Sequence, residues 1–130
     1  MKRGVDFDGT LATYHGWLGP TVLGGPIQLM VDRVKKWIEN GDETVILTAR
    51  VYPEDDPNSQ LAIEAIKQWC VEVFGQPLEV TCRKDPEMEE IWDDRAVSIR
   101  ENTGEIIFPD VDDPLDEEEP VDSIGEFFGG

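Results

Sequence analysis

Apolar residues follow two alternating patterns along this chain. Short continuous apolar runs, typical of strands buried in a sheet, are separated by longer segments with an apolar residue at every third or fourth position. The runs predict strands over 3–7, 44–48 and 78–82, and shorter strands over 90–94 and 96–99. The helical spacing predicts one helix from about Pro26 to Asn40, and a second that Asn58 or Ser59 caps and Gly75 ends.

The order of these elements predicts the fold class. Strands that alternate with helices indicate an α/β fold with a mainly parallel sheet, right-handed crossovers and helices on both faces. The Asn-Thr-Gly sequence at 102–104 predicts a turn that pairs the 96–99 strand with the apolar run after it, as a hairpin. In parallel sheets, ligands bind beyond the carboxyl ends of the strands, so those ends are where functional residues are expected.

Charge divides the 130-residue chain into two parts. The formal net charge is −18, and residues 109–130 contain nine acidic residues and no basic one. Residues 1–108 carry 20 acidic and 11 basic residues, a net charge of −9. We therefore expect one folded domain over 1–108 and an acidic, disordered tail over 109–130. So acidic a surface repels phosphates and argues against binding of long duplex nucleic acid.

The two cysteines and the hydropathy of the chain indicate the cellular compartment of the protein. Cys70 and Cys82 have no metal-like spacing, and no apolar run approaches 18 residues. We also expect no secretory leader. These features favour a cytoplasmic protein with reduced thiols and no membrane contact.

Chemically active side chains follow four of the predicted strands at their carboxyl ends. They are Asp6 and Asp8, then Thr48, then Arg83 and Lys84, then Asp93 and Asp94. In a parallel sheet these ends share one edge, where four carboxylates would repel one another, each pair by a few kcal/mol at an effective dielectric of about 20. A hard cation bound by oxygen ligands resolves that repulsion, and Mg²⁺ fits best.

These motifs resemble those of the haloacid dehalogenase superfamily, whose phosphohydrolases use an aspartate nucleophile. The family's DxDGT motif is similar to DFDGT at 6–10, and its strand ending in Thr or Ser is similar to VILT at 45–48. Its lysine and its acidic pair correspond to Lys84 in CRKDP and to WDDRA at 92–96. The resemblance covers about residues 3–97, and it implies a Rossmann-like three-layer sandwich with the first strand in the centre of the sheet.

The resemblance also implies roles in an Mg²⁺-dependent phosphatase reaction. Asp6 would be the nucleophile that forms an aspartyl-phosphate, and Asp8 would protonate the leaving group and then activate water. The Asp6 side chain, the Asp8 backbone carbonyl, and either Asp93 or Asp94 would bind the metal. Thr48 would bind a phosphoryl oxygen.

The remaining candidate residues surround these groups. Lys84 would neutralise the phosphoryl group, or Arg83 if the register differs by one residue. Gly9 permits a sharp turn and Thr10 fixes the loop, while Ala49 follows the threonine motif. Arg50 and Arg95 flank the site, either as ligands of an anionic substrate or as surface partners of the many acids. Trp17 and Trp92 are candidates for lining the site.

The spacing between motifs leaves no room for a large cap domain, which would need about 50 residues or more. An open site suits a phosphorylated small molecule, a nucleotide or a terminal phosphate on a nucleic acid. Two alternatives remain. The protein could bind phosphate or Mg²⁺ without catalysis, or it could act through its acidic tail, where Phe127 and Phe128 could dock on a basic partner.

Overall fold

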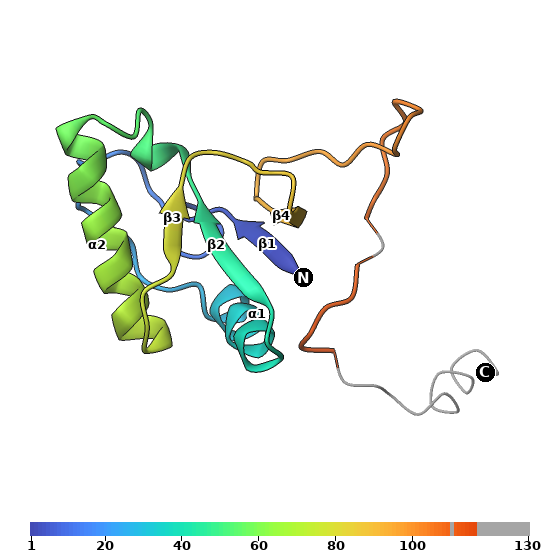
Figure 1. Cartoon of the computed structure of the whole chain (residues 1–130), viewed down its shortest axis with the longest axis horizontal. Coiled ribbons are helices and arrows are strands. Elements are labelled where there is room, and N and C mark those ends of the chain that lie inside the picture. Colours follow the sequence, from blue (N-terminus) through green and yellow to red (C-terminus); the bar gives the residue numbers. More distant parts are fainter. Residues whose placement is uncertain (110, 117–130) are drawn as a thin grey trace.

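Four parallel strands form the sheet of this protein, for which a computed structural model describes residues 1–109 and 111–116. The strands are β1 (Lys2–Val5), β2 (Glu43–Leu47), β3 (Glu79–Thr81) and β4 (Met88–Trp92), in the spatial order β3-β2-β1-β4 (Figure 1). β1 pairs with β2 on one side and with β4 on the other. The strand that precedes DFDGT is therefore central, as predicted.

Two helices connect the first three strands. They are α1 (Gln28–Glu39) and α2 (Pro57–Phe74), and a short 3-10 helix, η1 (Ala49–Val51), follows β2. The predicted stop at Gly75 is confirmed, because Gly75 adopts the left-handed conformation that ends a helix. The predicted cap is wrong, because the Asp56 side chain accepts the hydrogen bond from the Asn58 N–H at 2.7 Å.

Both helices pack on the same face of the sheet. A single hydrophobic core contains Trp37 of α1, Ile66 of α2, and Val5 and Ile46 of the strands. Two successive right-handed crossovers that step in the same direction, from β1 to β2 to β3, leave both helices on one side (Figure 1). The α/β class and the parallel sheet are as expected, and the described residues contain no large cap, also as expected. The arrangement differs from the expected three layers, because no helix among the described residues covers the opposite face.

The segment after β4 does not form the predicted strand over 96–99. Only one antiparallel bridge, between Ile99 and Ile106, joins the two arms of the expected hairpin, although Asn102 does adopt a turn conformation with φ of 67°. Val97, Ile99 and Ile106 are more than half exposed. An isolated two-stranded ribbon without packing is only marginally stable, so this segment stays irregular.

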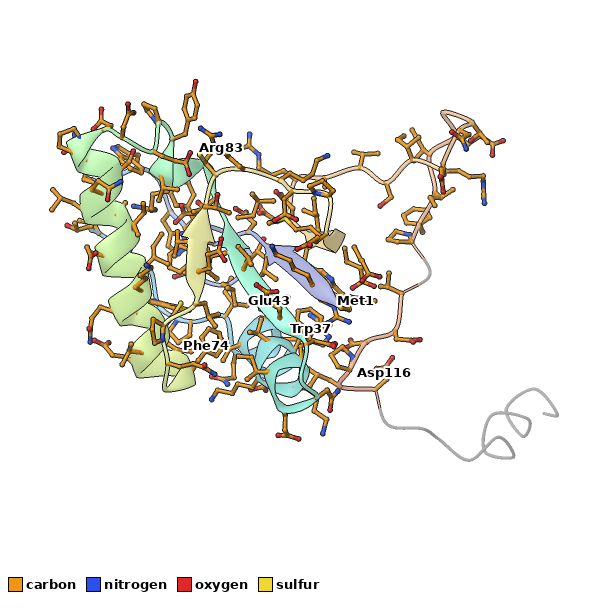
Figure 2. The ribbon with its side chains drawn as sticks, viewed as in Figure 1. Met1, Trp37, Glu43, Phe74, Arg83 and Asp116 are labelled. Atoms are coloured by element: carbon orange, nitrogen blue, oxygen red, sulfur yellow. The ribbon has the colours of Figure 1, made fainter. Side chains whose placement is uncertain are left out.

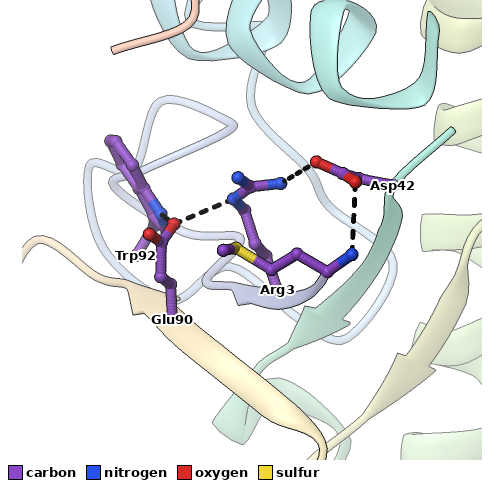
Figure 3. Close-up of polar contacts among 5 residues, drawn as sticks. Arg3, Asp42, Glu90 and Trp92 are labelled. Atoms are coloured by element: carbon purple, nitrogen blue, oxygen red, sulfur yellow. Dashed lines mark hydrogen bonds and ion pairs between the residues drawn. The ribbon is translucent and has the colours of Figure 1, made fainter. Parts of the chain in front are cut away.

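A buried arginine, Arg3, links three segments near the amino-terminal end of β1. The Arg3 guanidinium lies 2.8 Å from Asp42 Oδ2 and 2.8 Å from Glu90 Oε1 (Figure 3). It also lies over the Trp37 ring, 4.3 Å from the ring centre. The Trp92 indole N–H also donates to Glu90, at 3.1 Å. This cluster fixes β1 against β4 and against the turn before β2.

The start of the acidic segment runs beside α1. Asp113 forms a two-pronged ion pair with Arg33 at 3.0 and 2.8 Å, and the described chain ends at Asp116, labelled in Figure 2. The rest of the predicted tail, with Phe127 and Phe128, lies outside the described residues. Among the helices that the structure describes, none is long and apolar enough to cross a membrane.

Candidate functional site

Three carboxylates converge beyond the ends of β1 and β4. The Asp6 N–H donates to the Trp92 carbonyl at 2.9 Å, so the residue after β1 lies beside the residues after β4. Carboxylate oxygens of Asp6, Asp93 and Asp94 all lie within 4.8 Å of one another. The predicted convergence is therefore present in the fold, for three of the four aspartates.

The loop after β1 turns back sharply to make this approach possible. The Phe7 carbonyl accepts hydrogen bonds from the Leu11 and Ala12 N–H groups at 2.9 and 3.0 Å. Gly9 has φ of +86°, and a Cβ at this position would lie 2.8 Å from Asp94 Oδ2. Glycine is required here both by the conformation and by the proximity of the Asp94 carboxylate.

Thr10 orients Asp94. Its hydroxyl donates to Asp94 Oδ1 at 3.0 Å and accepts from the Asp94 N–H at 3.1 Å. The same hydroxyl lies 3.4 Å from Asp6 Oδ2. Thr10 was predicted to fix the loop after β1. It does so through hydrogen bonds to Asp94, in the segment that follows β4.

The three carboxylates repel one another, and their protonation reflects this repulsion. Burial, together with the neighbouring Asp94 and Asp93 carboxylates, raises the pKa of Asp6 to about 7. Burial disfavours the charge on Asp94 as well, but hydrogen bonds from Asp6 and Thr10 outweigh it and lower the pKa of Asp94. One proton shared between Asp6 and Asp94 therefore relieves the repulsion. A hard divalent cation would displace that proton, and the all-oxygen donor set fits Mg²⁺.

Asp8 lies apart from this group, in a bidentate ion pair. Arg50 Nε and Nη2 lie 2.9 and 2.7 Å from the two Asp8 carboxylate oxygens. Arg50 Nη1 donates to the Gly19 and Pro20 carbonyls at 2.9 and 3.3 Å, and the guanidinium lies 4.7 Å from the centre of the Trp17 ring. The arginine is almost fully buried by these partners. Arg50 was predicted either to bind an anionic substrate or to pair with acids at the surface. It pairs with an acid, Asp8, but this pair is largely buried.

Thr48 and Ala49 follow β2 on the same side. Thr48 is buried, and its hydroxyl oxygen accepts the Arg50 N–H at 3.1 Å. That bond uses the oxygen of the hydroxyl and leaves its hydrogen available to donate to a ligand.

These residues surround one open cavity of about 780 Å³. Its wall includes Asp6, Asp8, Thr48, Ala49, Asp93 and Asp94, and also Tyr14, Trp17 and Arg95. Trp17 thus lines the cavity as expected, whereas Trp92 does not. Tyr14 was not among the residues expected at this cavity; its place in the loop that follows DFDGT is the signal that could have identified it.

The two cations after β3 do not line this cavity. Lys84 is exposed, and Arg83, labelled in Figure 2, pairs with Glu54 at 2.6 Å. The proposed contact between Lys84 and a phosphoryl group stays a prediction. Arg95 is the cation that lies on the cavity wall without an ion-pair partner among the described residues.

Comparison with known proteins supports the fold and goes no further. No family model matches the chain, and no curated protein matches it. The chain is similar to a solved structure described as a conserved protein coded by a locus of Bacteroides thetaiotaomicron, with 21% identity over 75% of this chain and 78% of that chain, and a TM-score of 0.51. At this level of identity the similarity concerns the fold alone: this protein has a small α/β fold with a parallel sheet.

Proposed function

We propose that this protein is a Mg²⁺-dependent phosphohydrolase that cleaves a phosphomonoester through an aspartyl-phosphate. The observation that carries the proposal is the division of the four aspartates into two environments. Three carboxylates form a cation site, and Asp8 is held separately by Arg50 on the wall of the same cavity. A reaction that needs a nucleophile on a metal and a separate proton carrier requires this division.

In the first step, an Asp6 carboxylate oxygen attacks phosphorus, and the bond between phosphorus and the leaving-group oxygen breaks. Asp8, once it has taken up a proton from solvent on one oxygen and released the Arg50 contact to that oxygen, donates this proton to the departing oxygen. In the second step, water attacks the phosphorus of the aspartyl-phosphate, Asp8 takes a proton from the water, and the Asp6 carboxylate is released. The Thr48 hydroxyl hydrogen and the Arg95 guanidinium are the donors available for the phosphoryl oxygens.

Asp6, Asp93 and Asp94 would hold Mg²⁺, together with the Asp8 backbone carbonyl that the family resemblance implies. The cation would neutralise phosphoryl charge and allow Asp6 to be ionised at neutral pH. Thr10 and Gly9 support this site by positioning Asp94.

Asp6→Asn is the direct test, because it preserves shape and removes the nucleophile. We expect turnover of p-nitrophenyl phosphate with Mg²⁺ to fall by at least about 10³-fold, which corresponds to about 4 kcal/mol of barrier. Folding should be retained, because one of several mutually repelling carboxylates is gone. Asp112→Asn makes the same charge change at an exposed position and serves as the control.

Retention of wild-type turnover by Asp6→Asn would contradict the aspartyl-phosphate mechanism. If the wild type binds Mg²⁺ but cleaves neither aryl nor alkyl phosphates, the alternative of a non-catalytic binding protein is favoured instead.

A further inference from the structure

Two exposed aromatic side chains stand on the wall of the cavity that contains the carboxylates. Trp17 is 56% exposed and Tyr14 is 44% exposed, and both come from the 13–25 loop. Neither belongs to the hydrophobic core. Large aromatic surface left in water beside a polar site has a cost that a bound ligand would remove.

The Trp17 ring is held in place before any ligand arrives. The Arg50 guanidinium covers it at 4.7 Å from the ring centre, and Arg50 is itself fixed by Asp8 and by the Gly19 and Pro20 carbonyls. With Arg50 on the ring and more than half of the side chain exposed, ring surface remains open for stacking. A ring oriented in this way loses little conformational entropy when a second planar group stacks on it.

The loop that carries both aromatics is anchored at its base. The Thr13 N–H donates to the Gly25 carbonyl at 2.9 Å, and the Ile27 N–H donates to the Leu11 carbonyl at 2.7 Å. The Trp69 indole N–H donates to the Gly24 carbonyl at 3.0 Å, which ties the loop to α2. The aromatic wall is therefore part of the folded domain.

The number of unpaired lysine and arginine side chains at the cavity limits the size of the anion that can bind there. Seven of the 11 lysine and arginine side chains form ion pairs with carboxylates. Of the other four, which have no ion pair among the described residues, Arg95 alone lines the cavity. One such cation and one metal site suit a single phosphate. They do not provide the row of positive charges that holds a polymer backbone, and the net charge of −18 would repel one.

We propose that Trp17 and Tyr14 form a stacking subsite for the leaving group, so that the substrate is a small phosphomonoester with a planar heteroaromatic ring, of the class of a nucleoside monophosphate. This inference rests on the proposed phosphohydrolase function for the phosphate end. The evidence for the aromatic part of the substrate is the exposure of the Trp17 and Tyr14 rings on the cavity wall. Stacking of a base on an aromatic side chain strengthens binding by roughly 5- to 150-fold per base.

The test uses adenosine 5′-monophosphate and ribose 5-phosphate, which share phosphate and sugar and differ by the base. With Mg²⁺ and the full-length protein, we expect kcat/KM to be at least about tenfold higher for the nucleotide. Trp17→Leu should reduce that preference about tenfold, whereas Trp17→Tyr should keep most of it. Phe108→Leu, at an exposed aromatic away from the cavity, should not change the preference.

A second readout does not depend on catalysis. The indole N–H resonance of Trp17, assigned by its loss in Trp17→Leu, should shift on addition of the nucleotide and much less on addition of ribose 5-phosphate. Equal shifts, or equal loss of turnover for both compounds in Trp17→Leu, would overturn the stacking subsite while leaving the phosphatase proposal intact. If the shift is selective but no phosphate is hydrolysed, the proposed function fails and the subsite stands. Faster cleavage of a phosphorylated oligonucleotide than of the mononucleotide would overturn the assignment of substrate size.

Discussion

At the scale of single residues, the pair between Asp8 and Arg50 distinguishes this site from a simple cluster of acids. Both carboxylate oxygens of Asp8 and three guanidinium nitrogens of Arg50 are engaged. Because these contacts occupy most of the guanidinium N–H donors, few remain to bind a phosphate. We therefore assign Arg50 a positioning role. In the proposed mechanism, it holds the carboxylate that would exchange a proton with the leaving group and with water.

Arg50→Lys tests this role, because lysine keeps the charge and cannot form the two-pronged contact. We expect turnover of alkyl phosphates, whose leaving groups need a proton, to fall by roughly 10- to 100-fold. Turnover of p-nitrophenyl phosphate should fall less, since its leaving group departs without protonation. The measurement is kcat for both substrates, with the melting temperature of each variant recorded alongside.

The control is a double-mutant cycle. In an Asp8→Asn background, Arg50→Lys should have little further effect on turnover, because the residue that it positions has already lost its function. Additive losses in the double mutant would assign Arg50 a separate role, such as direct contact with the substrate.

At the scale of elements, the site is made by the carboxyl ends of β1 and β4, two strands that are far apart in sequence and paired in the sheet. The parallel register brings Val5 opposite Trp92, and the next residues on each strand are the acids. Three carboxylates are thereby brought together at the carboxyl ends of these strands. If a metal binds there, it competes with protons for the same oxygens.

The raised pKa of Asp6 makes this competition measurable. Its folded-state pKa of about 7 exceeds the ordinary 3.8, so the folded protein binds more protons than the unfolded chain between these two values. Without metal, the stability contribution of Asp6 is full at low pH and is lost as the pH rises through about 7. Because the carboxyl is partly exposed, we discount the effect to on the order of 1–2 kcal/mol.

Under the proposed function Mg²⁺ should reverse this loss, because a bound cation favours the ionised form of the carboxylates. Thermal melts from pH 5.5 to 8.5, with EDTA or with Mg²⁺, should show a larger stabilisation by Mg²⁺ at pH 8 than at pH 6. The Asp93→Asn, Asp94→Asn double mutant should lack the stabilisation. If the difference in stability between the wild type and Asp6→Asn in EDTA does not change with pH, Asp6 does not titrate as assigned.

At the scale of the whole molecule, the folded core is separate from the acidic segment, which carries half of the net charge. Every residue of the buried core cluster lies between Val5 and Leu78, with Trp92 packed against it. Beyond Phe108, the Arg33–Asp113 ion pair joins the described part of the acidic segment to α1. Partly exposed ion pairs of this kind stabilise a fold by about 1 kcal/mol or less.

Truncation after Phe108 should therefore leave a folded protein. We expect the melting temperature to fall by a few degrees at low salt, and by less at high salt, because the lost contribution is electrostatic. Full-length Asp113→Asn should reproduce most of the change. A fall much larger than in Asp113→Asn would indicate that residues after Phe108 stabilise the domain by packing.

Much of the fold could be predicted, because its signals are local. The helical spacing of apolar residues located α1 and α2, and the continuous run before Thr48 located β2. The strand expected over 96–99 did not form, because apolar alternation predicts a strand only where a neighbour covers it, and Ile99 has a single bridge partner. The cap of α2 was expected at Asn58 or Ser59, two or three residues too late, since all three residue types are good caps and only the path of the chain selects Asp56.

By itself, the sequence determined the order of the elements and the placement of Asp6, Thr48, Asp93 and Asp94 at strand ends. Hydrophobic periodicity and the geometry of parallel strands determine both, and neither depends on how the loops run. Only the tertiary structure decided that Asp8 pairs with Arg50, 42 positions away, that Lys84 does not line the cavity, and that Trp17 rather than Trp92 lines it. These outcomes depend on the direction in which each loop leaves its strand, which is set by long-range packing and hydrogen bonds rather than by the residues of the loop alone.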